Sequence, residues 1–165
     1  MPNNLKVLGI DPGYERLGMA VIEKKETGKE FLVFSDCVKT SNKEEHWNRL
    51  YKIDLALEEC IKRDQPEVLA IETLFFNTNQ KTAIKVAEVR GVIMSTAAKY
   101  GMKVKEFNPL QVKQAITGYG RSEKRQVIAT LPYIIKIDKK IKYDDEFDAI
   151  AVALACSATL SSLRI

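Results

Sequence analysis

The fold class of this 165-residue chain follows from its first apolar run and the turn behind it, Leu5-Lys6-Val7-Leu8-Gly9-Ile10-Asp11-Pro12-Gly13. The apolar part predicts a buried strand, and Asp-Pro-Gly predicts the turn that ends it. Two more β-rich runs follow at residues 17–24 and 31–38, with Glu26-Thr27-Gly28-Lys29 between them. Short β-rich runs joined by a polar turn are typical of hairpins, so these runs predict a three-stranded antiparallel meander.

A helical pattern comes next. Ser41-x-x-Glu44 has the form of a capping box, so a helix is expected to begin at Ser41 and to end at Gln65-Pro66. Apolar residues at three- and four-residue spacing predict one apolar face of this helix. They are Trp47, Leu50, Ile53, Leu57 and Ile61.

The rest of the chain alternates between strand and helix patterns. Strands are expected at Val68–Ile71, directly before Glu72, and at Lys103–Phe107. Helices are expected from Gln80 to Tyr100, from Asn108-Pro109 to Gly118, after Ser122, and from about Asp145 to Ser161. This order predicts an α/β protein with a mixed five-stranded sheet, an antiparallel meander followed by parallel strands, flanked by helices on both faces. No repeat or linker divides the sequence, so residues 1–165 are expected to form a single domain.

Composition excludes several classes of protein. The chain is 45% apolar and 29% charged, which is unlike disordered or collagen-like sequences. Lys6 interrupts the N-terminal apolar run, which argues against a signal peptide. The longest uncharged run, residues 149–163, is shorter than the roughly 20 residues that span a bilayer. A cytoplasmic protein is therefore expected.

Charge is distributed unevenly along the chain. Residues 99–142 contain 11 of the 26 basic residues and 3 of the 22 acidic ones, so the remainder of the chain is net acidic. Such a basic segment favours a polyanion as partner. A solvated, lysine-rich surface has the same composition, and charge alone does not choose between the two.

The supply of histidine and cysteine limits the chemistry. His46 is the only histidine, and Cys37, Cys60 and Cys156 are odd in number and widely spaced. This pattern fits reduced, buried thiols better than a disulfide framework or a zinc site. Any acid–base or metal chemistry must therefore come from carboxylates.

Four carboxylates stand at the ends of predicted elements. Asp11 follows the first strand, Glu72 follows a buried strand, and Asp145 and Asp148 share one face at the start of the last helix. Sites in α/β sheets lie beyond strand ends, so Asp11 and Glu72 come together if their strands are neighbours. Converging carboxylates repel each other unless cations neutralise them, and oxygen ligands without His or Cys suit Mg²⁺ or Mn²⁺. Two such ions can activate water and stabilise the leaving oxygen in phosphodiester hydrolysis.

Each carboxylate also has an ordinary structural explanation. Asp11 can be a turn residue, Glu72 a solvent-facing charge at a strand end, and the acidic residues 144–146 a complement to the helix dipole. Asp148 fits such explanations less well, because it opens the apolar run Ala149–Ala155. The functional interpretation depends on the convergence of all four groups at one edge of the sheet.

Motifs along nearly the whole chain carry a family resemblance. In order, they are Gly9-Ile10-Asp11-Pro12-Gly13 with Gly18; Ala70-Ile71-Glu72 with Phe75, Phe76 and Asn79; Lys85 with Arg90-Gly91-Val92; Pro109 with Gln111-Val112-Lys113-Gln114; Gly118-Tyr119-Gly120 with Glu123-Lys124-x-Gln126-Val127; and Asp145-x-x-Asp148-Ala149-x-Ala151. In this order, spacing and chain length, the sequence resembles the RuvC family of Holliday-junction resolvases, within the RNase H-like nuclease superfamily.

The resemblance implies a fold and a metal-dependent reaction. Asp11, Glu72, Asp145 and Asp148 are expected to be the catalytic residues and to hold two Mg²⁺ ions, for which Mn²⁺ can substitute, with Asp11 bridging both. Asp144 and Glu146 are adjacent alternatives to Asp145. The implied reaction, in DNA recombination and repair, is hydrolysis of one phosphodiester in each of two opposed strands of a four-way junction. Water is the nucleophile, and the products are a 5′-phosphate and a 3′-hydroxyl.

The same resemblance gives the basic segment a role in binding DNA. It places Lys113 and Lys124 near the scissile backbone, and Arg121 and Arg125 flank Lys124, from where they can reach neighbouring phosphates. Contacts of this kind depend on salt and not on base sequence.

A loop after the second acidic segment is also expected to contact the junction. Phe75, three residues past Glu72, corresponds to a wedge that stacks on junction bases, with Phe76 as the alternative and Asn79 in the same motif. Base–aromatic stacking contributes about 1–3 kcal/mol.

A two-fold junction cut in two strands requires two active sites, so a C2 homodimer is expected. The small-residue stripe Ala83, Ala87 and Gly91 could form the interface or pack on its own sheet. The resemblance also implies a branch-migration helicase complex of the RuvA and RuvB type as a partner. Two alternatives remain, a non-catalytic junction-binding protein and an RNase H-like nuclease that acts on RNA. An actin-like phosphotransferase is disfavoured, because 165 residues leave no room for its second lobe.

Overall fold

The N-terminal meander forms as the sequence predicts. The computed structural model describes residues 4–74 and 80–162. In it β1 (Leu5–Asp11) pairs antiparallel with β2 (Arg16–Lys24), and β2 pairs antiparallel with β3 (Glu30–Lys39). Gly28 adopts a positive φ of 84° in the turn between β2 and β3, a conformation that glycine tolerates best.

Two parallel strands complete the sheet. β4 (Val68–Glu72) lies beside β1, and β5 (Lys103–Phe107) lies beside β4, which gives the order β3-β2-β1-β4-β5. Ile10 is paired with Ile71 in the parallel register. The ends of β1 and β4 are therefore adjacent, which confirms the condition on which the proximity of Asp11 and Glu72 depended.

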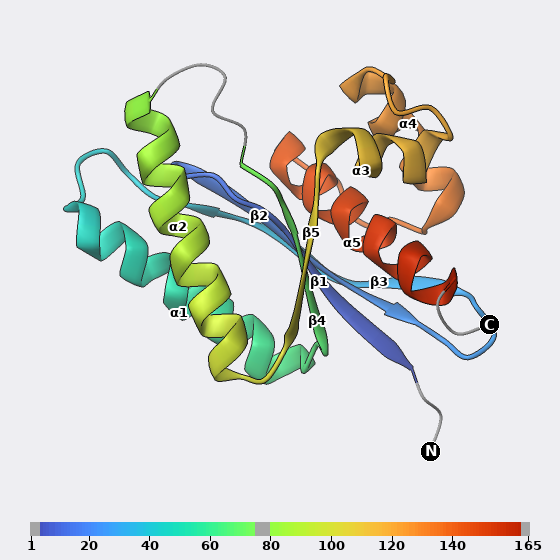
Figure 1. Ribbon diagram of the computed structural model, residues 1–165, viewed down its shortest axis with the longest axis horizontal. Coiled ribbons are helices and arrows are strands. Elements are labelled where there is room, and N and C mark those ends of the chain that lie inside the picture. Colours follow the sequence, from blue (N-terminus) through green and yellow to red (C-terminus); the bar gives the residue numbers. More distant parts are fainter. Residues whose placement is uncertain (1–3, 75–79, 163–165) are drawn as a thin grey trace.

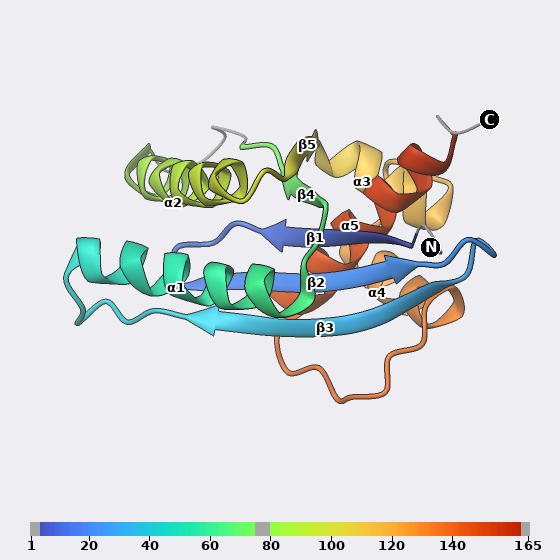
Figure 2. The same ribbon diagram turned by 90° about the horizontal axis from the view of Figure 1, so that it is seen from below.

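Helices cover both faces of the sheet, as predicted (Figures 1 and 2). α1 (His46–Asp64) and α2 (Gln80–Lys99) lie on one face. α3 (Pro109–Thr117), α4 (Lys124–Ile134) and α5 (Asp144–Ser162) lie on the other. The alternation of side chains along β1 serves both layers, because Val7 packs in the core beneath α5 and Leu8 packs in the core beneath α1.

The expected start of α1 was wrong by five residues. One hydrogen bond of the expected capping box does form, because the Ser41 amide donates to the Glu44 carboxylate at 2.9 Å. The two residues close a separate turn, however, and α1 begins only at His46. The predicted apolar face was also partly wrong: Ile53 is buried, whereas Trp47 is 66% exposed.

α5 lies unusually close to the strands that it covers. A Cβ atom at Gly9 of β1 would stand 2.2 Å from the Ala149 carbonyl oxygen and 2.7 Å from the Ala153 Cβ. A Cβ atom at Gly18 of β2 would stand 1.8 Å from the Asp145 carbonyl oxygen. Glycine at these two positions, Gly9 facing Ala149 and Ala153 and Gly18 facing the backbone of Asp145, lets α5 rest directly on the backbone of the sheet.

We expect Gly9→Ala to destabilise the protein by about 1–3 kcal/mol, because the added methyl group forces α5 away from β1. Urea unfolding measures this loss. Thr82→Ala, at an exposed position of α2, serves as the control and should change stability by less than about 0.5 kcal/mol. A Gly9→Ala variant as stable as this control would contradict the close contact.

Candidate active site

Four carboxylates meet where the ends of β1 and β4 face the first turns of α5. Asp11 is the last residue of β1, and Glu72 is the last residue of β4. Asp145 and Asp148 lie in the first two turns of α5, which Gly18 allows to approach the sheet. All four positions singled out in the sequence thus come to one edge of the sheet.

The proximity of these groups shows in their ionisation. Burial, with further contributions from the charges of Asp148, Glu72 and Asp145, raises the pKa of Asp11 to about 8. Burial and the charge of Asp148 raise the pKa of Glu72 to about 7. Carboxylates that hold their protons near neutral pH are poorly solvated and mutually repelled, a condition that a bound cation relieves.

Cationic side chains of the protein contact the two aspartates of α5. The Lys124 ammonium lies 2.7 Å from Asp148 Oδ2, and Arg16 Nε lies 3.2 Å from Asp145 Oδ2. Burial by itself lowers the pKa of Lys124, but the hydrogen bond to Asp148 and the charges of Asp148, Asp144 and Asp11 together outweigh it, and the pKa is raised. Asp148 is therefore paired with Lys124 and Asp145 with Arg16, and the two cations approach this edge of the sheet from different elements, α4 and β2.

A small hollow opens beside this cluster. Its volume is about 250 Å³, and Glu72, Asp148, Lys113 and Lys124 are among the residues that line it. The predicted lysines thus share one cavity wall with two of the predicted carboxylates. An anion in this hollow would lie beside two ammonium groups as well as the acidic groups.

The donor set fits a hard divalent cation. Within residues 4–74 and 80–162, no three His, Cys, Asp or Glu side chains converge closely enough to share one ion. Asp145 Oδ2 is nevertheless buried and makes no hydrogen bond, despite its ion pair with Arg16. A buried carboxylate oxygen that makes no hydrogen bond, beside carboxyl groups of raised pKa, is suited to Mg²⁺ or Mn²⁺.

The two residues next to Asp145 in the sequence, Asp144 and Glu146, have different surroundings in the structure. Glu146 is buried, accepts a hydrogen bond from the Ser35 hydroxyl at 2.9 Å and forms an ion pair with Lys139 at 2.7 Å. It therefore holds α5 to β3 and does not face the cluster. Asp144 is exposed and lies 3.8 Å from Lys124. Of the two alternatives, only Asp144 is near the site.

Two buried arginines hold the backbone behind the carboxylates. Arg90 of α2 donates to the carbonyl oxygen of Glu72 and pairs with Glu106 of β5. Arg49 of α1 donates to the carbonyl oxygen of Tyr14, just after the Asp11 turn, at 3.3 Å. Sequence reasoning missed these supporting roles, because an arginine on the inner side of a helix carries no signal of its partner.

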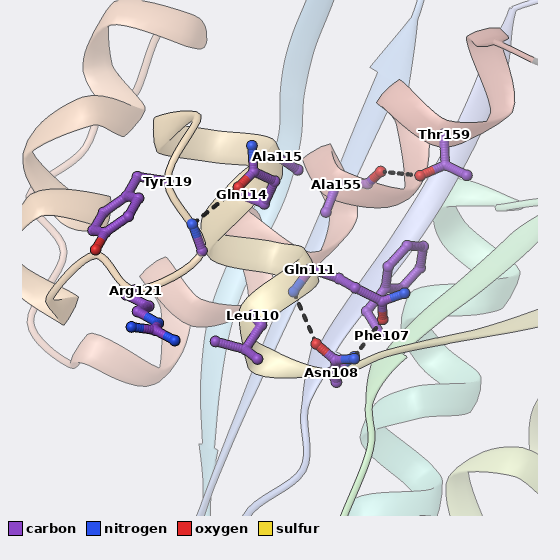
Figure 3. A pocket seen from close by; sticks show the side chains of 11 residues that line it. Phe107, Asn108, Leu110, Gln111, Gln114, Ala115, Tyr119, Arg121, Ala155 and Thr159 are labelled. Carbon is purple, nitrogen blue, oxygen red and sulfur yellow. Dashed lines mark hydrogen bonds between the residues drawn. The ribbon is translucent and has the colours of Figure 1, made fainter.

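The two predicted arginines of the basic segment are not among the residues that line the small hollow. Arg121 lines a larger hollow of about 740 Å³ with Leu110 and Tyr119, shown in Figure 3. The loop that carries Arg121 is fixed to α3, since the Gly120 amide donates to Gln114 at 3.0 Å. Arg125 is exposed and pairs with Glu123 at 2.6 Å.

Comparison with known proteins now decides the family. The profile of the crossover junction endodeoxyribonuclease RuvC family matches residues 7–156. This chain belongs to the RuvC family. A crossover junction endodeoxyribonuclease RuvC from Moorella thermoacetica is 42% identical over 158 residues, which cover 96% of this chain and 93% of the relative.

Solved RuvC structures match the whole architecture. Thermus thermophilus RuvC is 32% identical, with a TM-score of 0.85 over 96% of this chain and 97% of that chain. A structure of T. thermophilus RuvC in complex with a Holliday junction substrate is 29% identical, with a TM-score of 0.85 over 95% of this chain and 96% of that chain. The RNase H-like fold predicted from the sequence is thereby confirmed.

Some RuvC features predicted from the sequence stay predictions. Phe75, Phe76 and Asn79 lie outside the described residues, so the structure does not place the wedge.

Arg16 was not predicted at all, although it forms the ion pair with Asp145. Among the described residues, no helix is long and apolar enough to cross a membrane.

Metal-free protein is expected to lose stability as the pH rises from about 5 to about 8.5. The folded state holds the protons of Asp11 and Glu72 more tightly than the unfolded chain, for which the pKa values are 3.8 and 4.5. Their contribution to stability is complete below pH 4 or so and is lost as the pH passes the folded values of about 7 and 8. Thermal unfolding in EDTA measures the effect as a falling Tm.

Asp11→Asn should flatten this dependence, and millimolar Mg²⁺ should restore the Tm of the parent protein at high pH. Asp138→Asn, at an exposed position on the segment between α4 and α5, is the control and should behave like the parent. A parental slope in Asp11→Asn would show that the Asp11 carboxyl group is already ionised in the metal-free fold.

Proposed function

We propose that this RuvC family member resolves four-way DNA junctions, by metal-dependent hydrolysis of one phosphodiester in each of two opposed strands. Family membership gives the class of enzyme, a crossover junction endodeoxyribonuclease. The convergence of Asp11, Glu72, Asp145 and Asp148 beside Lys124 carries the proposal for this chain. No observation on the described residues favours a non-catalytic binder or a nuclease that acts on RNA.

The nucleases of this family are metal-dependent, and the four carboxylates are the groups that we propose as metal ligands. Two Mg²⁺ ions, or Mn²⁺ ions in their place, would supply an activated water and would stabilise the leaving oxygen. Asp11 is the natural shared ligand, because its pKa responds to the charges of all three other groups. Asp144 is the nearest alternative should Asp145 keep its ion pair with Arg16.

The remaining side chains of the site act on the DNA backbone. Lys113 and Lys124 stand in the wall of the small hollow beside Glu72 and Asp148, where they can neutralise a phosphate that approaches the carboxylates. Lys124 is held by Asp148 at 2.7 Å, so its position is fixed before DNA binds. A preorganised cation requires little rearrangement when charge develops on the phosphate.

The exposed face of α1 and α2 supports a homodimer. Trp47, Tyr51 and Leu55 follow one another at four-residue spacing on α1 and are 66%, 60% and 47% exposed. On α2, Ala87 and Gly91 are exposed, so this part of the small-residue stripe does not pack on its own sheet. A contiguous apolar surface of this kind is typical of an interface.

Three further parts of the proposal do not depend on the geometry of the site. These are a single nuclease domain over residues 1–165, a cytoplasmic location and a branch-migration complex of the RuvA and RuvB type as partner. The two apolar cores on the two faces of one sheet support the single domain.

Asp11→Asn and Asp148→Asn are each expected to slow cleavage of a synthetic four-way DNA junction in Mg²⁺ by about a hundredfold or more, which corresponds to about 2.7 kcal/mol of transition-state stabilisation. Junction binding should persist. Asp138→Asn is the control and should cut at the parental rate. A parent protein that binds junctions without cutting them at any core sequence, or that prefers RNA junctions, would contradict the proposal.

Tyr51→Glu combined with Ala87→Glu should convert the dimer to a monomer of 18.7 kDa, because two buried charges oppose the apolar interface. Light scattering coupled to gel filtration measures the mass. Tyr133→Glu, at a 90% exposed position on α4, is the matched control and should leave the dimer intact. A dimer in the double variant would place the interface elsewhere.

A further inference from the structure

The ring of Tyr143, which immediately precedes α5, is surrounded by three cations from different parts of the chain. The distances to its centroid are 5.4 Å from the Arg16 guanidinium, 4.6 Å from the Lys39 ammonium and 5.3 Å from the Lys142 ammonium. Lys39 also donates a hydrogen bond to the Tyr143 hydroxyl at 3.0 Å. These four residues are called the Tyr143 cluster below. Three like charges on one ring repel each other, which leaves a locally positive surface.

Two of the three cations in the cluster form no ion pair with a carboxylate among the described residues. Arg16 pairs with Asp145, whereas neither Lys39 nor Lys142 forms an ion pair with a carboxylate among the described residues. Both lysines are exposed.

The cluster lies at the same edge of the sheet as the carboxylates, on their other side. Arg16 opens β2 and is paired with Lys39 at the end of β3, while Asp11 is paired with Gly18. The cluster is therefore on the β2–β3 side of Asp11, and Lys124 stands on the opposite side with α4. The acidic groups thus have cations on both flanks.

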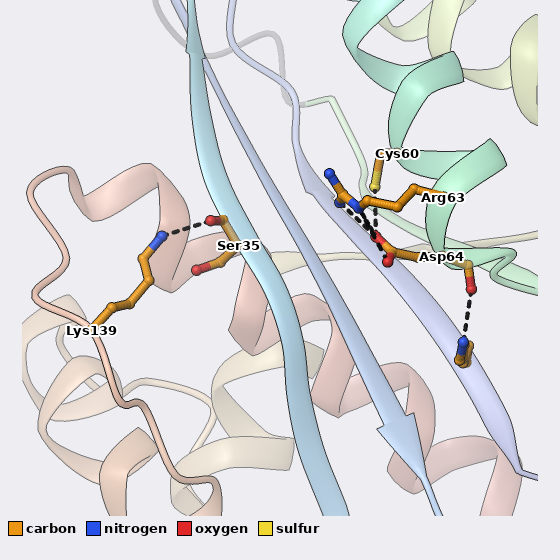
Figure 4. Close-up of polar contacts among 6 residues, drawn as sticks. Ser35, Cys60, Arg63, Asp64 and Lys139 are labelled. Carbon is orange, nitrogen blue, oxygen red and sulfur yellow. Dashed lines mark hydrogen bonds and ion pairs between the residues drawn. The ribbon is translucent and has the colours of Figure 1, made fainter.

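The segment that carries Lys142 and Tyr143 is fixed in place. Residues 135–143 run from α4 to α5 past the edge strand β3, as Figure 2 shows. Lys139 anchors this segment by donating to the Ser35 carbonyl oxygen at 2.6 Å, which is drawn in Figure 4, and by pairing with Glu146. Lys142 is thereby presented beside Lys39 at a defined position.

We propose that the Tyr143 cluster binds the phosphodiester backbone of a DNA arm as it leaves the carboxylates on the β2–β3 side. The inference rests on the proposed function, because it extends the DNA path across the same site. A phosphate chain that crosses four acidic groups is repelled there and is held by cations before and after them. The Tyr143 hydroxyl accepts from Lys39, which leaves its own O–H free to donate to a phosphate oxygen.

The test compares two double variants that each remove two positive charges. Lys39→Gln with Lys142→Gln keeps hydrogen-bond donors at the cluster but removes the charge. Lys29→Gln with Lys103→Gln removes two exposed charges at the opposite edge of the sheet, where β3 and β5 begin. Binding of a four-way DNA junction is measured by fluorescence anisotropy over a range of KCl concentrations in EDTA, where no cleavage occurs.

Lys39→Gln with Lys142→Gln should reduce the slope of log affinity against log salt by about 1–2, since each lost phosphate contact removes about 0.9. The control variant should keep the parental slope. Equal slopes in both variants, whether parental or reduced, would overturn the proposal. It would also be overturned if Lys39→Gln with Lys142→Gln kept the parental slope for DNA but lost affinity for polyglutamate, because the cluster would then bind an acidic protein. A junction that binds with the expected slopes but is never cut in Mg²⁺ would instead refute the proposed function.

Discussion

The contact of α5 with the backbone of β1 and β2 is the constraint on which the site depends. Gly9 and Gly18 leave no side chain between the helix and the sheet, and the carbonyl oxygens of Ala149 and Asp145 occupy the space that a Cβ atom would need. The residues of α5 from Ala149 to Cys156 are all nearly inaccessible to solvent. This burial fixes the distance of α5 from the sheet and its rotation about its own axis. It thereby also fixes the positions of Asp145 and Asp148 relative to the ends of β1 and β4.

The electrostatics of the site follow from this packing. Because α5 packs closely on the sheet, four carboxylates occupy one edge. Burial, together with the charges of the other three groups, raises the pKa of Asp11 to about 8. Arg16 and Lys124 contact the two aspartates of α5 from different sides, so the edge alternates between acidic and basic groups. The net charge of +4 is thus the difference between a basic surface that suits a phosphate backbone and an acidic centre that suits divalent cations.

Sequence reasoning succeeded where the signal is local and failed where it depends on a distant partner. The alternating strands and the Asn108-Pro109 start of α3 were confirmed, because capping and side-chain periodicity act over a few residues. Ser41 and Glu44 matched a local rule but cap a turn, since α1 begins later. Arg16 could not be predicted, because its ion pair with Asp145 exists only after α5 has crossed β2. The placement of Asp11, Glu72, Asp145 and Asp148 at the ends of predicted elements singled them out, and the family resemblance implied their role as metal ligands.

The most direct measurement is the Mn²⁺ affinity of Gly18→Ala, determined by calorimetric titration at a temperature where circular dichroism shows the variant to be folded. A methyl group at Gly18 meets the Asp145 carbonyl oxygen, so the variant retains all four carboxylates but displaces the first turn of α5. The account predicts that Mn²⁺ binds about tenfold more weakly or worse, a loss of about 1.4 kcal/mol. Parental Mn²⁺ affinity in the folded variant would contradict it, because the metal site would then not depend on how closely α5 approaches the sheet.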